Sequence, residues 1–146
     1  MIQNILTKEV VRTGVAVKDW QEAIHEGMKP LLAGGYVEPR YEEAVFASFQ
    51  EMGPYMVIAP GVVLSHARPE HGVLKMGMSI VNLEEGVKFH HETNDPVYLV
   101  ITLAASDNTA HLEVLRELMA ILMEESKLET LMFEKDLEKV LALFAV

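Results

Sequence analysis

Two histidines follow apolar runs of the chain, at positions where catalytic and ligand-binding residues are common in an α/β sheet. Residues 62–64 form a short apolar run that is typical of a buried strand, and His66 follows it almost at once. Pro69 cannot donate to a strand ladder and restricts the residue before it, so we expect this strand to end near Arg68. His111 follows the most continuous apolar run, residues 97–105, in the first turn of the helix expected there. If the two strands run parallel, both imidazoles emerge at one edge of the sheet.

An imidazole that faces a second imidazole and a helix N-terminus is suited to phosphoryl transfer. Backbone amides at a helix N-terminus form an anion site, and the helix dipole contributes about 0.3–1 kcal/mol toward a bound negative charge. Near neutral pH an ordinary imidazole is mostly unprotonated and nucleophilic. We therefore interpret His66 as the group that attacks a phosphoryl group and holds it covalently. His111 would donate to a phosphoryl oxygen, and Arg68 would add positive charge.

The composition excludes several other classes of protein. The 146 residues contain no cysteine, which rules out disulfides and thiolate sites and favours a reducing cytoplasm. The formal net charge of −10 opposes binding to nucleic acid. The N-terminus does not have the pattern of a secretory signal, and no apolar run reaches the roughly 20 residues of a membrane helix. We expect a cytoplasmic protein without membrane insertion.

The order of the expected elements predicts one α/β domain over residues 1–146, with a sheet of about five strands covered on both faces. The expected strands are 12–17, 55–58, 62–64, 73–83 and 97–105, with 84–86 as a turn and 87–89 as a short returning strand. Asp19 is expected to cap a helix that ends at 34–35, and Pro39 to begin a second helix that ends at Gly53. The expected core positions of that second helix are Tyr41, Val45, Phe49 and Met52. A third helix should bury Leu112, Leu115, Met119 and Leu122, and residues 126–144 should form one or two more.

Plainer interpretations remain open for the histidines at this point. A lone histidine after a strand is most often an ordinary loop residue, His25 is expected on a helix surface, and His90 and His91 in a loop. His66 and His71 are five residues apart across a proline, so they do not form a helical metal pair, and we predict no metal or cofactor. A hydrolase that uses His66 with Glu70 or Asp107 is a further alternative, although the G-x-S-x-G pattern is missing.

Several segments taken together resemble a known protein family. They are Gly53-Pro54-Tyr55-Met56-Val57-Ile58-Ala59-Pro60-Gly61, Ser65-His66-Ala67-Arg68-Pro69-Glu70, Asn94-Asp95-Pro96-Val97 and His111-Leu112-Glu113. The ordered set, which covers about residues 10–122, is similar to the IIA (EIIA) components of the bacterial sugar phosphotransferase system (PTS), in the mannitol/fructose superfamily. The residues of these segments are most similar to those of the ascorbate-type branch.

The resemblance implies a cytoplasmic phosphocarrier with a three-layer α/β/α sandwich and a mixed sheet. His66 would accept a phosphoryl group from phospho-HPr and pass it to a cysteine of the EIIB component, and the membrane component EIIC takes part only indirectly. His111 would hold the phosphoryl oxygens, and Ser65, Arg68 and Glu70 would contact the phosphoryl group or a partner. A regulatory phosphoprotein of the nitrogen-PTS type, without a transport role, is the alternative.

Two positions depart from the pattern of the family. Mannitol-type members have an arginine sixteen residues before the active histidine, where this chain has Gln50. Many relatives have proline directly before that histidine, where this chain has Ser65. The first departure argues against a helper role for an arginine at this position and against the mannitol branch.

Overall fold

A five-stranded mixed sheet forms the centre of the computed structural model. The model describes residues 2–106 and 108–144, apart from the side chains of Gln3, Asn108, Ala110 and His111. The strands are β1 Val11–Val15, β2 Val57–Ala59, β3 Val62–Ser65, β4 Gly77–Val87 and β5 Val97–Ala104. Their spatial order is β1-β4-β5-β3-β2. The pairs β1/β4 and β3/β5 are parallel, and β4/β5 and β2/β3 are antiparallel.

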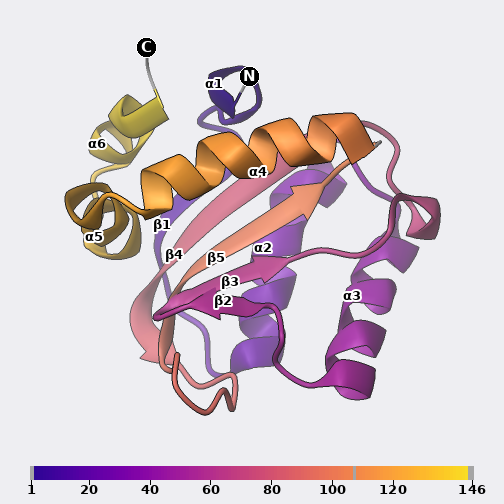
Figure 1. Ribbon diagram of the computed structural model, residues 1–146, viewed down its shortest axis with the longest axis horizontal. Helices are drawn as coiled ribbons and strands as arrows, with labels where there is room; N and C mark the ends of the chain where they lie inside the picture. The colour runs from indigo at the N-terminus through magenta and orange to yellow at the C-terminus, as the bar shows by residue number, and fades with distance from the viewer. Residues whose placement is uncertain (1, 107, 145–146) are drawn as a thin grey trace.

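Helices cover both faces of this sheet, which confirms the three-layer α/β/α arrangement (Figure 1). Helices α2 (Trp20–Ala33) and α3 (Pro39–Met52) pack on one face. Helices α4 (Asn108–Leu122) and α5 (Glu125–Phe133) pack on the other, with α1 (Ile2–Ile5) and α6 (Leu137–Leu141) beside them. None of the helices within the described residues is both long enough and apolar enough to cross a membrane.

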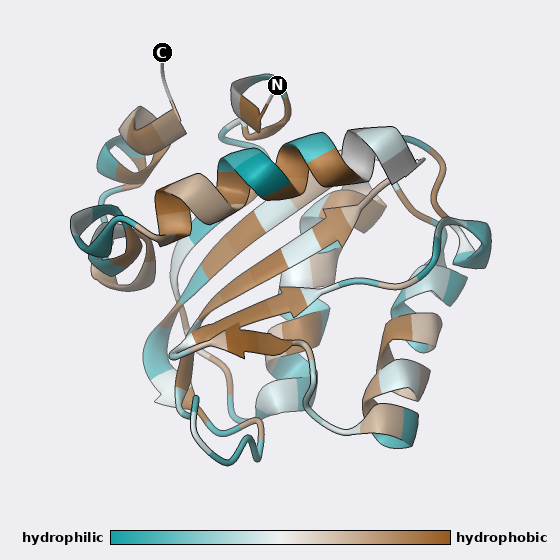
Figure 2. Ribbon diagram, in the orientation of Figure 1, coloured by the Kyte–Doolittle hydropathy of each residue, from teal (hydrophilic) through white to brown (hydrophobic). Residues whose placement is uncertain are grey.

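The two faces of β5 explain why its sequence is continuously apolar. Leu99, Ile101 and Leu103 are buried in the core beneath α4 and α5. Val100 and Ala104 are buried in the second core, beneath α2 and α3. Because successive side chains of a strand point to opposite faces, a strand between two cores needs apolar residues at nearly every position. Figure 2 shows the resulting hydrophobic band along the central strands.

The expected helix boundaries on the α2/α3 side are confirmed. The Asp19 carboxylate accepts a hydrogen bond of 2.9 Å from the Glu22 amide and so caps α2. Pro39 is the first residue of α3, and Gly53 ends it with a φ of 76°, a conformation that favours glycine.

Two expectations about individual elements are wrong. Residues 84–86 are not a turn: β4 continues through them to Val87, which pairs with Val97 after an irregularity in the ladder. Glu84 and Glu85 are exposed there, so they are solvated within a strand and need no turn. The strand also begins only at Gly77, four residues later than expected.

The predicted core stripe of α4 is only partly right. Leu122 is buried and Leu115 packs half-buried against the same core, as predicted. Leu112 is 62% exposed and Met119 39% exposed, however, and Val114 and Leu118 are buried in their place. Both sets have helical spacing, so periodicity alone cannot tell which face meets the sheet. The same holds at the end of α3, where Met52 is 62% exposed instead of buried. Helices α1, α5 and α6 pack beside α4, and α5 and α6 confirm the two helices expected within 126–144.

Candidate functional site

His66 lies where β3 ends and the chain enters a loop, as expected. Strands β3 and β5 run parallel, with Ser65 level with Thr102, so the ends of both strands meet at one edge of the sheet. Helix α4, which is 15 residues long, begins four residues after the end of β5, and its N-terminus therefore lies at this edge. The condition for bringing His66 and the start of α4 to a common edge is therefore met.

A short contact orients the imidazole of His66. Its Nδ1 lies 2.9 Å from the carbonyl oxygen of Leu64, two residues earlier in β3. A carbonyl oxygen only accepts hydrogen bonds, so Nδ1 carries the proton of the neutral ring and donates it to Leu64. The lone pair of the neutral imidazole is then on Nε2. This is the nitrogen that can act as a nucleophile.

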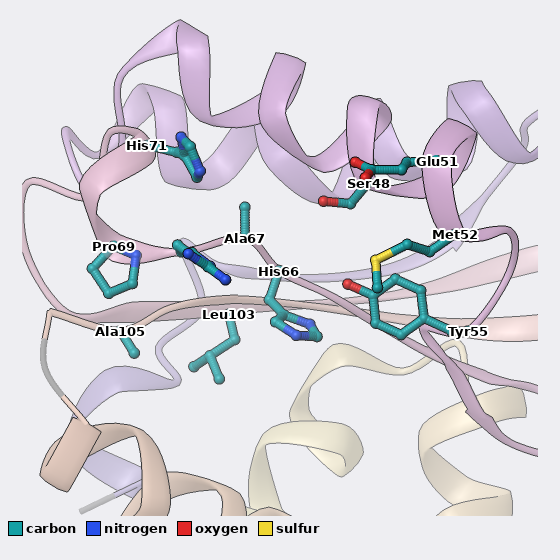
Figure 3. A pocket seen from close by; sticks show the side chains of 11 residues that line it. Ser48, Glu51, Met52, Tyr55, His66, Ala67, Pro69, His71, Leu103 and Ala105 are labelled. Carbon is teal, nitrogen blue, oxygen red and sulfur yellow. The ribbon is translucent and has the colours of Figure 1, made fainter.

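A pocket of about 660 Å³ opens beside His66 (Figure 3). It is lined by residues from the last turns of α3, from the loop after β3 and from the end of β5. The lining residues are Ser48, Glu51, Met52, Tyr55, His66, Ala67, Arg68, Pro69, His71, Leu103 and Ala105. The predicted residues His66 and Arg68 therefore share one concave surface, which also includes His71.

Met52 and Tyr55 are pocket residues that sequence reasoning assigned elsewhere. The Tyr55 ring meets the His66 ring edge-on, with 6.4 Å between the ring centroids, and 45% of Tyr55 is exposed. Figure 3 shows the two rings turned toward the same space. The signal that could have identified these residues is the Gly53-Pro54 turn, which lies between Met52 at the end of α3 and Tyr55.

The hydroxyl of Tyr41 joins α3, the His66 loop and β5. It donates to the Leu103 carbonyl oxygen at 2.7 Å and accepts the Ala67 amide N–H at 2.9 Å. The Ala67 carbonyl oxygen lies 3.2 Å from the same hydroxyl. Tyr41 is fully buried, and this burial raises the pKa of its hydroxyl to about 12 even though the bond to Ala67 acts in the opposite direction. The sequence predicted Tyr41 only as a core residue.

Arg68 and Glu70 form a loose charged pair beyond His66. Arg68 Nη1 lies 3.9 Å from Glu70 Oε1, and the side chains are 81% and 63% exposed. A short 3₁₀ turn, Pro69–His71, follows Arg68, and Arg40 Nη1 donates to its Glu70 carbonyl oxygen at 3.0 Å. Arg68 thus presents its positive charge at the mouth of the pocket.

Ser65 does not occupy the position expected of a residue that contacts a partner. Its side chain is fully buried on the α2/α3 face of the sheet, and its hydroxyl has no hydrogen-bond partner among the described residues. Successive side chains of a strand alternate between faces, so Ser65 points inward just before His66 leaves the sheet. The side chain of Ser65 is therefore not exposed to a partner protein in this structure, and its role at the site stays a prediction.

The predicted second histidine cannot be placed fully. The backbone of His111 lies in the first turn of α4, but its side chain and all of Asp107 lie outside the described residues. The pairing of His66 with His111 and the hydrolase alternative that uses Asp107 therefore stay predictions.

The other singled-out residues have local structural partners or lie outside the pocket. The His25 ring is 2.8 Å from Glu42 and links α2 to α3, and 47% of the His25 side chain is exposed. His91 Nδ1 accepts the backbone amides of Thr93 and Asn94. His90 has a φ of 65° in the same loop.

Gln50 is exposed on α3, outside the pocket. Within the described part of the chain, no three His, Asp or Glu side chains gather as metal ligands.

Known proteins share both the sequence and the fold of this chain. Residues 4–145 match the family model described as phosphoenolpyruvate-dependent sugar phosphotransferase system, EIIA 2. The ascorbate-specific PTS system EIIA component of Salmonella typhi is 40% identical over 134 residues, which are 91% of this chain and 87% of that protein. Its counterpart in Escherichia coli K12 is 42% identical over 111 residues, 76% of this chain and 72% of that protein.

Solved structures give the same result. The cryptic mannitol-specific phosphotransferase enzyme IIA of Escherichia coli superposes with a TM-score of 0.88 at 36% identity, covering 99% of this chain and 98% of that one. The mannitol enzyme IIA of Escherichia coli, in a complex with phosphorylated enzyme IIB, gives a TM-score of 0.84 at 30% identity, covering 95% and 96%.

Proposed function

This chain belongs to the EIIA 2 family of the phosphoenolpyruvate-dependent sugar phosphotransferase system, and we propose that His66 is the residue that carries the phosphoryl group. The observation that carries this proposal is the bond from His66 Nδ1 to the Leu64 carbonyl, because it leaves the nucleophilic lone pair on Nε2. The pocket beside the ring gives a partner protein access to it.

The transfer itself exchanges one nitrogen–phosphorus bond for another. The lone pair of His66 Nε2 attacks the phosphorus of a phosphohistidine on HPr, and the bond from phosphorus to the donor imidazole breaks with its electrons returning to that ring. No water or metal is needed for this balance. As the new bond forms, positive charge develops on the His66 ring, and the Leu64 carbonyl stabilises it through Nδ1–H.

Three further groups are proposed to act on the phosphoryl oxygens. Arg68 contributes positive charge from the mouth of the pocket. The first backbone amides of α4 lie at the same edge of the sheet and favour an anion there. His111, in that first turn, is proposed to donate a hydrogen bond to the phosphoryl group.

The partners and substrate follow from the relatives. The chain acts as a phosphotransferase-system carrier that receives the group from phospho-HPr and passes it to an EIIB component, and a mannitol enzyme IIA has been solved with its phosphorylated enzyme IIB. The relatives that are about 40% identical are ascorbate-specific, so we propose an ascorbate-type EIIB as the acceptor, with EIIC acting indirectly at the membrane. Residues 1–146 would work as one EIIA domain in the cytoplasm. No observation favours the regulatory alternative over this role.

Incubation with phospho-HPr, followed by intact-mass measurement, tests the assignment of His66. The wild-type chain should gain one phosphoryl group, and His66→Ala should gain none. His71→Ala is the matched control, because His71 lines the same pocket and should leave labelling intact. Full labelling of His66→Ala would disprove the assignment.

A second assay separates the acceptor proteins. The labelled chain is mixed with purified EIIB proteins of the ascorbate and mannitol types, and loss of label is followed over time. Faster transfer to the ascorbate-type EIIB supports the substrate proposal, and faster transfer to the mannitol type contradicts it.

A further inference from the structure

We infer that Tyr41 is a positioning residue for phosphoryl transfer, holding the backbone beside His66 at a fixed place relative to β5. The inference rests on the proposed role of His66. Tyr41 does not line the pocket, and so it acts through the backbone of Ala67.

The hydrogen bonds of Tyr41 fix the residue that follows His66. Leu64 on the other side belongs to β3 and receives the Nδ1–H of the His66 ring. Ala67 is held by its amide N–H, which donates to the Tyr41 hydroxyl at 2.9 Å. The backbone of His66 is therefore held on both sides, by a strand before it and by a side-chain hydrogen bond after it.

The same hydroxyl connects the loop to the segment that leads to α4. It donates to the carbonyl oxygen of Leu103, which lies one residue before the end of β5. One oxygen atom thus links the His66 loop to the end of β5, just beyond the last paired residues of the two strands, Ser65 and Thr102. Because α4 follows β5, this oxygen also fixes His66 relative to the helix N-terminus that is proposed to receive the phosphoryl oxygens.

The ion pair between Arg68 and Glu70, further along the loop, could not replace this connection. Arg68 and Glu70 are largely exposed, and their ion pair is 3.9 Å long. Exposed pairs of this kind order a backbone weakly. The Tyr41 hydroxyl, in contrast, is buried and keeps its proton up to a pKa of about 12, so it donates and accepts throughout the neutral range.

The test compares Tyr41→Phe with Ser79→Ala. The Ser79 hydroxyl is also buried, and it donates at 2.5 Å to the Gly27 carbonyl of α2, away from the His66 loop. Both variants therefore lose one buried hydroxyl. Single-turnover transfer from phospho-HPr is measured over a range of HPr concentrations, and the ¹⁵N resonances of the His66 ring report its tautomer.

We expect Tyr41→Phe to lower the saturating transfer rate by on the order of tenfold to a hundredfold, because small misplacements of a reacting group have effects of that size. The HPr concentration for half-saturation should change less than about twofold, since the docking surface is intact. The fraction of His66 that is protonated at Nδ1 should fall. Ser79→Ala should keep the wild-type rate and tautomer.

The outcomes distinguish this inference from the proposal on which it rests. A wild-type chain that takes no label from phospho-HPr overturns the role of His66. A wild-type chain that is labelled, together with Tyr41→Phe that transfers as fast as Ser79→Ala, overturns the inference alone. If Tyr41→Phe does not fold, 4-aminophenylalanine at position 41 keeps a donor for Leu103 and weakens acceptance from Ala67. A reduced rate in that variant supports the inference, and the wild-type rate overturns it.

Discussion

At each end of the sheet a buried polar side chain links neighbouring elements, and the two ends differ in which elements are linked. At the end that contains His66, the Tyr41 hydroxyl joins α3, the loop after β3 and β5. At the opposite end, Asn82 of β4 joins β1 to the segment between α5 and α6. Both side chains form hydrogen bonds with backbone groups of other elements.

Asn82 shows what such a connection does when no chemistry is nearby. Its Oδ1 accepts the Gly14 amide at 2.7 Å and lies 3.4 Å from the Lys135 ammonium. Its Nδ2 donates to the carbonyl oxygens of Leu131 and Glu134 at 3.0 and 2.7 Å. These partners lie in β1, in α5 and in the segment between α5 and α6. The comparison teaches that one device, a satisfied buried polar group, stabilises packing at one end and sets the geometry of a site at the other.

The largest expected effect on stability comes from replacing Asn82, at the end of the sheet away from His66. Asn82→Leu removes the bonds to Gly14, Leu131 and Glu134 and leaves their backbone groups unpaired, so we expect a loss of about 3–4 kcal/mol in the free energy of unfolding. Urea unfolding monitored by circular dichroism measures it. Phosphoryl transfer per folded molecule should stay within about twofold of wild type. A large fall in transfer by the folded fraction would contradict the separation of the two ends.

The Tyr41 end should show a pH dependence that an amide cannot give. The folded pKa of Tyr41 is raised to about 12 from an ordinary 10.0, so its contribution is fully present below pH 10 and is lost as the pH rises to 12. We expect the stability advantage of wild type over Tyr41→Phe to shrink by about 2 kcal/mol between pH 9 and 12. Urea titrations of the two proteins at each pH measure this difference. An advantage that stays constant would show that the hydroxyl titrates normally.

Much of this fold follows from the sequence because burial dictates composition. The continuous apolar run 97–105 predicted a strand with a core on each side, and β5 has that position. Periodicity failed where two faces are both apolar, as in α4, where Leu112 is exposed and Val114 is buried. The sequence pattern also failed at residues 84–86, because the exposed acidic residues near the end of β4 have the composition of a turn.

The candidate site was predictable only where its residues are adjacent to a strand end. His66 and Arg68 could be identified from the run that precedes them, and both line the pocket. Tyr41 could not, because a tyrosine in a helical stripe has the pattern of a core residue. Its partners Ala67 and Leu103 are 26 and 62 residues away, and backbone partners leave no sequence signal.

A row of buried hydroxyls across three strands sharpens the comparison between satisfied and unsatisfied groups. Ser79, Thr102 and Ser65 are neighbours across β4, β5 and β3. The Ser79 hydroxyl is bonded to Gly27, whereas the Thr102 hydroxyl has no partner within the described residues. Thr102→Val keeps the shape and removes the unpaired group, so we expect a gain of about 1 kcal/mol in the free energy of unfolding. Ser79→Ala should lose about as much, and thermal unfolding of both variants measures the two signs. A loss in Thr102→Val would mean that its hydroxyl is hydrogen-bonded in solution.

The smallest expected change in stability lies at the exposed edge of the site. Arg68 and Glu70 are 3.9 Å apart and mostly exposed, so Arg68→Gln should change the free energy of unfolding by less than about 0.5 kcal/mol. Arg68 is nevertheless the positive charge at the mouth of the pocket in a chain with a net charge of −10. We expect transfer from phospho-HPr to slow by about twofold to fivefold at low salt and the difference to shrink at high salt. Lys139→Gln removes the same charge from α6, away from the pocket, and should leave the rate unchanged. Equal slowing in both variants would assign the effect to net charge, and Arg68 would then have no local role at His66.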